Sequence, residues 1–281
     1  MSAVLASNSY GKSSVRLTKV TRHADRHELK EISVDIQLHG DFDRSYTHGD
    51  NSSIVATDTM KNTVYALAKN HPLIDIESFA IHLGKHFLAN NTHVTQADVR
   101  IAEDSWQRIE VGGKPHRHSF VSGGNEKRTT HAACGRDKTA LNSGLENLLI
   151  LKTTQSGFVG FLRDQFTTLP ETTDRIFATS VSANWSYMGT SVDWNGCFKR
   201  IRNAMLDVFA DHESLAVQQT LFAMGEAALK VSPEIYQIEL TMPNQHRLLV
   251  NLKPLALDNP NEIFVPTNEP FGLISGTVKR K

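Results

Sequence analysis

The sequence has little cysteine, no excess charge of one sign and no long apolar run. Its two cysteines, Cys134 and Cys197, cannot form the set of disulfides that stabilises small secreted domains. Lysine and arginine total 30, as do aspartate and glutamate, so the chain lacks the positive charge that binds nucleic acid or anionic membranes. No run of about 18 apolar residues could span a membrane. We therefore expect a reduced protein that binds neither nucleic acid nor membrane.

Targeting signals are also missing from both ends. Residues 1–12 do not combine a basic region with the apolar stretch of a signal peptide. The last residues, 277–281 (TVKRK), are not a peroxisomal signal of the Ser-Lys-Leu type. We expect the protein to be cytoplasmic.

Histidine is plentiful, but its spacing does not predict a metal site. Among the 13 histidines, His82 and His86 lie four apart on a predicted helix, and His116 and His118 lie two apart in a predicted loop. Zinc needs three or four convergent ligands, commonly with cysteine or carboxylate, and no spacing here supplies them. No glycine-rich phosphate loop is present either, so the glycine pairs at 112–113 and 123–124 are expected to form turns. We expect no metal and no organic cofactor.

Periodicity predicts the same order of elements in both halves of the chain. Ile32, Val34, Ile36 and Leu38 alternate with polar residues, as in a half-buried strand, and residues 15–22 are its expected hairpin partner. The other predicted elements of the first half are a helix over 58–70, capped by Thr57 or Asp58 and ended by Pro72, a helix after the cap residue Asp75, and strands over 94–101 and 106–111, with 118–121 less clear.

The second half has strands over 145–154 and 181–187, then two helices, then two strands. The helices cover residues 194–208 and 221–229, and the last strands cover 236–242 and 248–252 with a turn at 243–245. The sequence therefore predicts an α+β fold with two domains, 1–136 and 137–281, although the halves share no visible residue identity. Short turns between strands imply antiparallel pairing, and two helices cover only one face of each sheet. The open faces and edges are expected to be closed by oligomerisation.

Taken singly, the candidate functional residues have ordinary explanations. Lys12 fits a solvated lysine, Thr57 and Asp58 a helix cap, and Arg175 a surface arginine. From these residues alone, the sequence indicates only an oligomeric α+β protein.

Several segments, in order along nearly the whole chain, together resemble the urate oxidase family. They are Tyr10-Gly11-Lys12, 50–63 (DNSSIVATDTMKNT), 113–120 (GKPHRHSF), 151–161 (LKTTQSGFVGF), 167–175 (TTLPETTDR), 216–220 (AVQQT), 243–246 (PNQH) and 272–274 (GLI). The resemblance implies two tunnelling-fold (T-fold) domains per subunit and a homotetramer whose sheets close into stacked β-barrels. It also implies oxidation of urate by O₂ to 5-hydroxyisourate and hydrogen peroxide, without a cofactor.

The resemblance also implies a set of substrate-binding residues. Phe158 would stack on the purine, while Arg175 and Gln218, with the backbone of Val217, would hold its pyrimidine edge. Backbone N–H groups at Thr57 and Asp58, supplied by a neighbouring subunit, would bind the imidazole edge. Further residues would complete the oxygen and water site and pack around the ring: Asn244, Thr57, Ile274 and Leu169.

The catalytic residues implied by the resemblance are Lys12, Thr57 and His246. They would form a proton relay, because urate must lose a further proton before it can reduce O₂.

Two other hypotheses remain open at this point. Another T-fold enzyme that acts on a pterin or purine, such as a cyclohydrolase or an aldolase, would share the fold, although a cyclohydrolase would need a zinc set. A non-catalytic purine-binding oligomer would be favoured if the triad were broken, but Lys12, Thr57 and His246 are all present.

Overall fold

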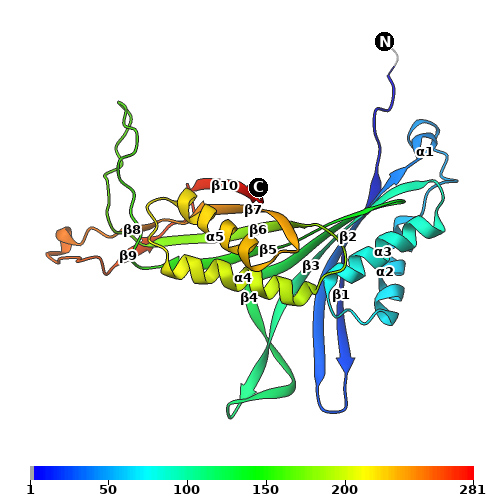
Figure 1. The fold of residues 1–281 in the computed structure, drawn as a ribbon, viewed down its shortest axis with the longest axis horizontal. Helices are drawn as coiled ribbons and strands as arrows, with labels where there is room; N and C mark the ends of the chain where they lie inside the picture. Colours follow the sequence, from blue (N-terminus) through cyan, green and yellow to red (C-terminus); the bar gives the residue numbers. More distant parts are fainter. Residues whose placement is uncertain (1–2) are drawn as a thin grey trace. The chain divides into compact units, whose positions relative to one another are not determined.

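The computed structural model describes residues 3–281, and the chain divides into two compact units. Unit 1 comprises Met1–Gly144 with Ser186–Asn195, and unit 2 comprises Leu145–Trp185 with Gly196–Lys281. Each unit combines antiparallel strands with helices, so the predicted α+β class is confirmed (Figure 1). The predicted domain boundary, between residues 136 and 137, stays a prediction.

The sheet of unit 1 has the strand order β1–β2–β3–β4. Its antiparallel strands are β1 (Tyr10–Arg22), β2 (His27–Gly40), β3 (Val94–Val111) and β4 (Lys114–Gly135). The alternation that predicted β2 is confirmed, because the side chains of Ile32, Val34, Ile36 and Leu38 are all buried. They form one face of the strand, as the period of two requires.

Two predictions for the hairpin of β3 and β4 need correction. The strands expected over 94–101 and 106–111 are one strand, β3, and residues 118–121 belong to β4. Gly112 and Gly113 make the predicted turn, with φ of 60° and 74°. Residues 123–124 do not form a turn: they lie within β4, where the register shifts, and Gly124 has φ 101°. A glycine pair inside a strand marks such an irregularity as readily as a turn.

Three helices belong to unit 1: α1 (Asp43–His48), α2 (Thr57–Asn70) and α3 (Ile76–Asn90). Asp75 caps α3 as predicted, since its carboxylate accepts the Ser78 N–H at 2.7 Å. The predicted cap of α2 is wrong. Its cap position is Ala56, which makes no side-chain hydrogen bond, and Thr57 and Asp58 are the first residues of the helix.

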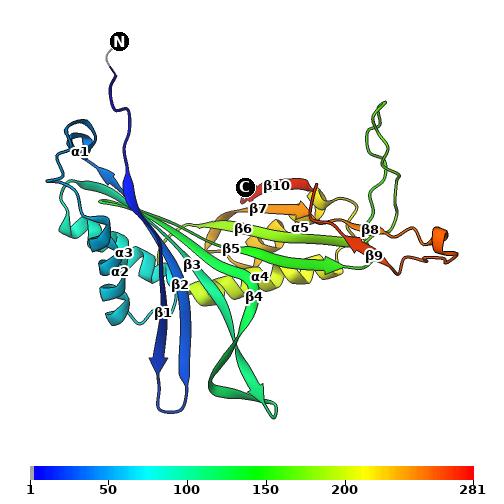
Figure 2. The same cartoon turned by 180° about the vertical axis from the view of Figure 1, so that it is seen from behind.

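Unit 2 repeats this arrangement. Its strand order is β5–β6–β7–β10, with bounds β5 (Thr139–Lys152, beginning in unit 1), β6 (Phe177–Tyr187), β7 (Ile235–Asn244) and β10 (Gly272–Lys279). Its helices are α4 (Trp194–Asp211) and α5 (Val217–Val231), which lie on one side of the strands in Figure 1 and behind them in Figure 2. Among the helices of residues 3–281, none is long and apolar enough to cross a membrane.

The last predicted strand of unit 2 is wrong. The partner of β7 is β10, and residues 243–244 continue β7 instead of turning. Within the expected strand, β8 (Arg247–Leu249) pairs with β9 (Phe264–Pro266), and η1 (Lys253–Leu255) follows. Leu248 is 53% exposed and Leu249 is 48% exposed, so the apolar alternation there does not mark a buried sheet.

Each unit has a lysine that binds carbonyl groups at the C-terminal end of a helix. A lysine of the first strand donates to two carbonyl oxygens three residues apart: Lys19 to Ala68 and His71, and Lys152 to Phe209 and His212. These carbonyls belong to the last turns of α2 and α4, where no intrahelical donor remains. Burial lowers the pKa of both lysines.

Each unit also has an arginine, Arg136 in unit 1 and Arg280 in unit 2, that donates to a similar set of backbone carbonyls. The carbonyl acceptors have the same spacing in both units: Leu88, Asn91 and Val94 for Arg136, and Leu229, Ser232 and Ile235 for Arg280. In each unit one helix, α3 or α5, has a glycine where it packs closely against a strand. A Cβ on Gly84 would lie 2.5 Å from Cys134 Sγ, and one on Gly225 would lie 2.6 Å from Val278 Cγ2. The repeat that the sequence shows only as element order therefore extends to individual contacts.

Candidate active site

A β-bulge turns Lys12 toward the helices of unit 1. Lys12 pairs with Ile36 and Val15 pairs with Val34, so three steps along β1 face two steps along β2. In a regular strand, Lys12 and Val15, three residues apart, would point to opposite faces. The extra residue in the bulge puts both on the same face of the sheet. Ser14, at φ 57°, lies in the bulge, and its N–H donates to Asp35 Oδ1 at 2.6 Å. Asp35 therefore fixes the irregularity that orients Lys12.

The N-terminus of α2 lies at the Lys12 end of β1. The Val55 N–H, just before the helix, donates to the Tyr10 hydroxyl at 2.7 Å. At the other end of the helix, the Ala68 carbonyl accepts from Lys19 at 2.7 Å. The helix and the strand thus run side by side in the same direction, and the structure brings Lys12, Thr57 and Asp58 to one end of unit 1.

The charges at this end favour an ionised Asp58. Its pKa is lowered first by the hydrogen bond from Lys61 and by the charge of Lys61, and the charge of Lys12 acts in the same direction. Because Ala56 provides no side-chain cap, the first N–H groups of α2 lack that acceptor. A helix start of this kind favours an anionic or carbonyl group of a ligand.

In unit 2, Phe158 and Arg175 lie against each other on an irregular segment. Phe158 is held by an antiparallel bridge to Thr172, with N–H to carbonyl distances of 2.7 and 3.1 Å. The Arg175 guanidinium carbon lies 5.5 Å from the centre of the Phe158 ring, and the Phe161 ring stacks on Phe158 at 4.9 Å. An aromatic face beside a fixed guanidinium suits a planar, anionic ring.

Arg175 is held in place but not fully hydrogen-bonded. Its backbone N–H donates to the Ser156 carbonyl at 2.8 Å. Its side-chain Nε is buried and has no partner among the described residues, and burial lowers the pKa of the guanidinium. A buried charged donor without an acceptor is costly, so this group is well suited to an anion supplied from outside.

The start of α5 joins the segment that carries Phe158. Ser214 accepts from the Gly157 N–H at 2.8 Å and donates its own N–H to the Gln155 carbonyl at 2.9 Å. The buried Thr220 hydroxyl donates to Ser214 Oγ at 2.7 Å, which fixes the turn into the helix. Val217 at this start is buried, whereas Gln218 is exposed and available to a ligand.

Asn244, His246 and Ile274 lie near the same end of unit 2. Asn244 pairs with Gly272, and Ile274 pairs with Met242 two residues further along the two strands. The helix α5 runs along β10 in the same direction. Leu221 packs against Gly276, where an added Cβ would lie 3.1 Å from Leu221 Cδ2, and Gly225, one turn later, packs against Val278. Its start therefore points toward the Gly272 end. The Gln245 N–H donates to the Ala178 carbonyl at 2.8 Å, which places 244–246 beside the first residues of β6, just after Arg175.

The predicted residues thus form two groups, one in each unit. Unit 1 brings together Lys12, Thr57 and Asp58. Unit 2 brings together Phe158, Arg175, Val217, Gln218, Asn244, His246 and Ile274. The supporting residues Asp35, Ser214 and Thr220 were not predicted, since a serine, a threonine and an aspartate in a strand or loop carry no distinguishing pattern.

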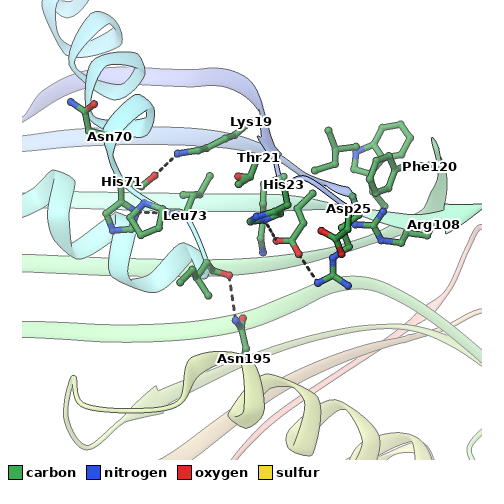
Figure 3. Close-up of a pocket in the computed structure, with 17 residues that line it drawn as sticks. Lys19, Thr21, His23, Asp25, Asn70, His71, Leu73, Arg108, Phe120 and Asn195 are labelled. Atoms are coloured by element: carbon green, nitrogen blue, oxygen red, sulfur yellow. Dashed lines mark hydrogen bonds and ion pairs between the residues drawn. The ribbon is translucent and has the colours of Figure 1, made fainter. Parts of the chain in front are cut away.

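Outside these two groups, the structure has no cluster of metal-ligating side chains among the described residues, and one cavity lies elsewhere in unit 1. Within residues 3–281, no group of three or more His, Cys, Asp or Glu side chains could hold a metal ion. One cavity, of about 1100 Å³, lies in unit 1 at the end of β1 away from Lys12 (Figure 3). Its charged groups bond within the protein: Lys19 to backbone carbonyls, Arg26 to Glu28 at 3.0 Å, and Arg108 to the His27 carbonyl. This cavity contains none of the predicted site residues.

The comparisons with known proteins agree with this fold. The family model described as Uricase matches residues 8–133 and 141–275. The uricase of Arthrobacter globiformis is 44% identical over 278 residues, which cover 99% of this chain and 90% of the relative, and that of Dictyostelium discoideum is 41% identical over 99% and 98%. A crystal structure of the Arthrobacter globiformis uricase superposes with a TM-score of 0.95, covering 100% of this chain and 96% of that one.

The duplicated α+β units and the match to solved uricases define a protein of the T-fold class. More narrowly, the chain belongs to the uricase family. The resemblance found in the sequence is therefore confirmed.

Proposed function

We propose that the protein is a urate oxidase that converts urate, O₂ and water to 5-hydroxyisourate and hydrogen peroxide, as a step of purine catabolism. The observation that carries this proposal is the pairing of Phe158 with Arg175, whose buried Nε has no acceptor within residues 3–281, in a chain of the uricase family. Urate is planar and anionic, so it satisfies both groups at once.

The binding groups fit the edges of a purine. Phe158 would stack on the ring while the Arg175 fork and the Gln218 amide bind the pyrimidine edge, supported by the backbone at Val217. The free N–H groups at Thr57 and Asp58 would bind the imidazole edge. Leu169 and Ile274 would pack around the ring and the oxygen site.

The chemistry needs positioning and proton transfer. Urate itself supplies the two electrons that reduce O₂ to hydrogen peroxide, and the hydroxyl oxygen of the product comes from water. Lys12, the Thr57 hydroxyl and His246 would move protons to and from the ring, and Asn244 would hold O₂, then peroxide, then water above it. No metal and no organic cofactor takes part in the proposed reaction.

A complete site would form between copies of the chain. Thr57 and Arg175 belong to different units, and the family resemblance assigns Thr57 and Asp58 to a neighbouring subunit. Two features support a homo-oligomer, and the family resemblance implies that it is a homotetramer. The strand orders end at β1 and β10, which are edges that can pair with another copy. Leu162 is 97% exposed and Phe166 is 78% exposed, which favours their burial in an assembly.

One assay tests the proposed function. The purified protein is treated exhaustively with chelator and mixed with urate in air, and urate absorbance and hydrogen peroxide are followed. We expect urate loss with one peroxide formed per urate, at the same rate as untreated protein. No urate oxidation would contradict the function, and a chelator-induced loss that copper, iron or zinc restores would contradict the cofactor-free mechanism.

A further inference from the structure

At the Lys12 end of β1, one hydrogen bond connects this strand with the residues that lead into α2 and Thr57. The Val55 N–H donates to the Tyr10 hydroxyl at 2.7 Å, across 45 positions in the chain. Tyr10 lies two residues before Lys12, and Val55 lies two residues before Thr57. The bond therefore fixes the backbone two residues before each predicted relay residue. Its loss should change the distance between the Lys12 side chain and the Thr57 hydroxyl.

The Tyr10 ring is itself fixed. It meets the buried Phe42 ring edge to face, with 4.7 Å between centroids, and it is only partly exposed. The next residue, Gly11, approaches β2 so closely that a Cβ would lie 1.8 Å from the Ile36 carbonyl oxygen. Burial, the largest effect, raises the pKa of Tyr10, so its hydroxyl stays neutral near pH 7. The strand thus provides a rigid support for the bond.

The start of α2 depends on such external support. Its first turn is closed by the Met60 N–H, which donates to the Ala56 carbonyl at 3.1 Å, but Ala56 adds no side-chain cap. The preceding turn is closed by the Ile54 N–H, which donates to the Asn51 carbonyl at 3.0 Å, but this contact is local. The Tyr10 hydroxyl is the contact that relates this turn to β1.

We propose that Tyr10 is a positioning residue for catalysis, which sets the distance between Lys12 and the Thr57 hydroxyl through Val55. This inference rests on the proposed function and on the relay of Lys12 and Thr57. Proton transfer depends steeply on donor and acceptor geometry, whereas binding of the planar ring is shared among many groups. Loss of the Tyr10 hydroxyl should therefore affect kcat more than KM.

The test compares two tyrosines that both bond to backbone near the start of β1, of which Tyr10 contacts Val55 and Tyr46 does not. Tyr10→Phe removes the acceptor of the Val55 N–H and keeps the ring contact with Phe42. Tyr46→Phe is the matched control, because the Tyr46 hydroxyl donates to the Ser9 carbonyl at 2.9 Å but does not contact Val55. We expect kcat to fall on the order of tenfold in Tyr10→Phe, with KM and anaerobic urate affinity changed less than about threefold. Tyr46→Phe should keep the wild-type kcat.

A double mutant separates positioning from general stability. If Tyr10 acts through the relay, adding Tyr10→Phe to Lys12→Met should lower kcat little further, because the aligned group is already absent. Melting temperatures of all four proteins show whether each variant is folded at the assay temperature.

Three results would overturn the inference: an unchanged kcat in Tyr10→Phe, an equal loss in Tyr46→Phe, or multiplicative losses in the double mutant. Failure of the proposed function is distinguishable, because the wild-type protein itself would then not oxidise urate.

Discussion

Arg175 and Lys12 have surroundings that differ from those of ordinary surface cations. Arg175 has a buried Nε that finds no acceptor in the described part of the chain, and its guanidinium lies against the Phe158 ring. Lys12 is turned by a bulge toward a helix start. These surroundings predict different roles, since Arg175 is placed to bind a charge and Lys12 to exchange a proton.

Replacing Arg175 should weaken binding. Arg175→Ala removes charged hydrogen bonds that ground state and transition state share, so urate affinity should fall by about 1.5 to 3 kcal/mol. The check is anaerobic titration with urate beside steady-state kinetics. Arg175→Lys, which keeps the charge but loses the planar fork, should recover only part of the affinity. Unchanged affinity in Arg175→Ala would remove this residue from the substrate site.

Replacing Lys12 should instead slow the reaction. Lys12→Met should lower kcat on the order of 10²-fold or more, with little change in urate affinity, because a proton-transfer group matters in the transition state. The double mutant with Thr57→Ala should be little worse than the worse single mutant, as expected for members of one relay. Strictly multiplicative losses would show that Lys12 and Thr57 act independently.

Among the elements, the loop after α2 contains a group sensitive to pH. His71 Nδ1 accepts the Leu73 N–H at 3.0 Å, which requires an unprotonated nitrogen. Burial, as the largest cause, and the charges of His82 and Lys19 lower the pKa of His71 below its usual value of 6.5, although Asp75 opposes them. The unfolded chain therefore binds this proton more readily, so stability should fall as pH decreases through 6.5 toward the lower folded pKa.

The variant His71→Asn tests this pH dependence. An asparagine side-chain oxygen can accept the same N–H two residues on, but it does not titrate. Between about pH 7.5 and 5.5 the melting temperature should fall less in this variant than in the wild type. Identical pH dependence in the two proteins would show that His71 does not contribute.

Most elements could be predicted from the sequence, and the errors have physical causes. The alternation of apolar and polar residues predicted β2. An aspartate, Asp75, before a helical pattern of apolar residues predicted the cap of α3. The cap of α2 was wrong because Thr57 fits a cap and a first helical residue equally well, and the helix has Ala56 at its cap position. The strand over 248–252 was wrong because β10 contributes only a weak apolar pattern, and its place depends on pairing with β7.

The site residues were found by family resemblance, whereas spacing alone could not have found them. Lys12 and Thr57 are 45 positions apart, and their proximity depends on the bulge in β1 and on the direction of α2. Arg175 follows an irregular segment whose shape is set by the bonds of Ser214. Neither arrangement leaves a periodic signal in the sequence.

At the scale of the whole molecule, the two units carry different parts of one proposed site. The repeated lysine and arginine contacts show that the units share one plan, but only unit 1 carries Lys12 with Thr57, and only unit 2 carries Phe158 with Arg175. A homotetramer with shared sites would use both units of every chain. The cytoplasmic location expected from the sequence stays a prediction.

The central claim is that catalysis needs unit 1 of one copy and unit 2 of another, and mixing inactive variants tests it most directly. Thr57→Ala and Arg175→Ala proteins are dissociated together, reassembled in equal amounts and assayed with urate at a concentration where each alone is inactive. Each variant reassembled alone and wild type treated in the same way are the controls.

The account predicts recovery of about a quarter of the wild-type activity, because random assembly gives that share of sites an intact Thr57 and an intact Arg175 from different chains. Hybrids that form, as shown by differently tagged chains, and yet remain inactive while the wild-type control recovers would contradict the shared site.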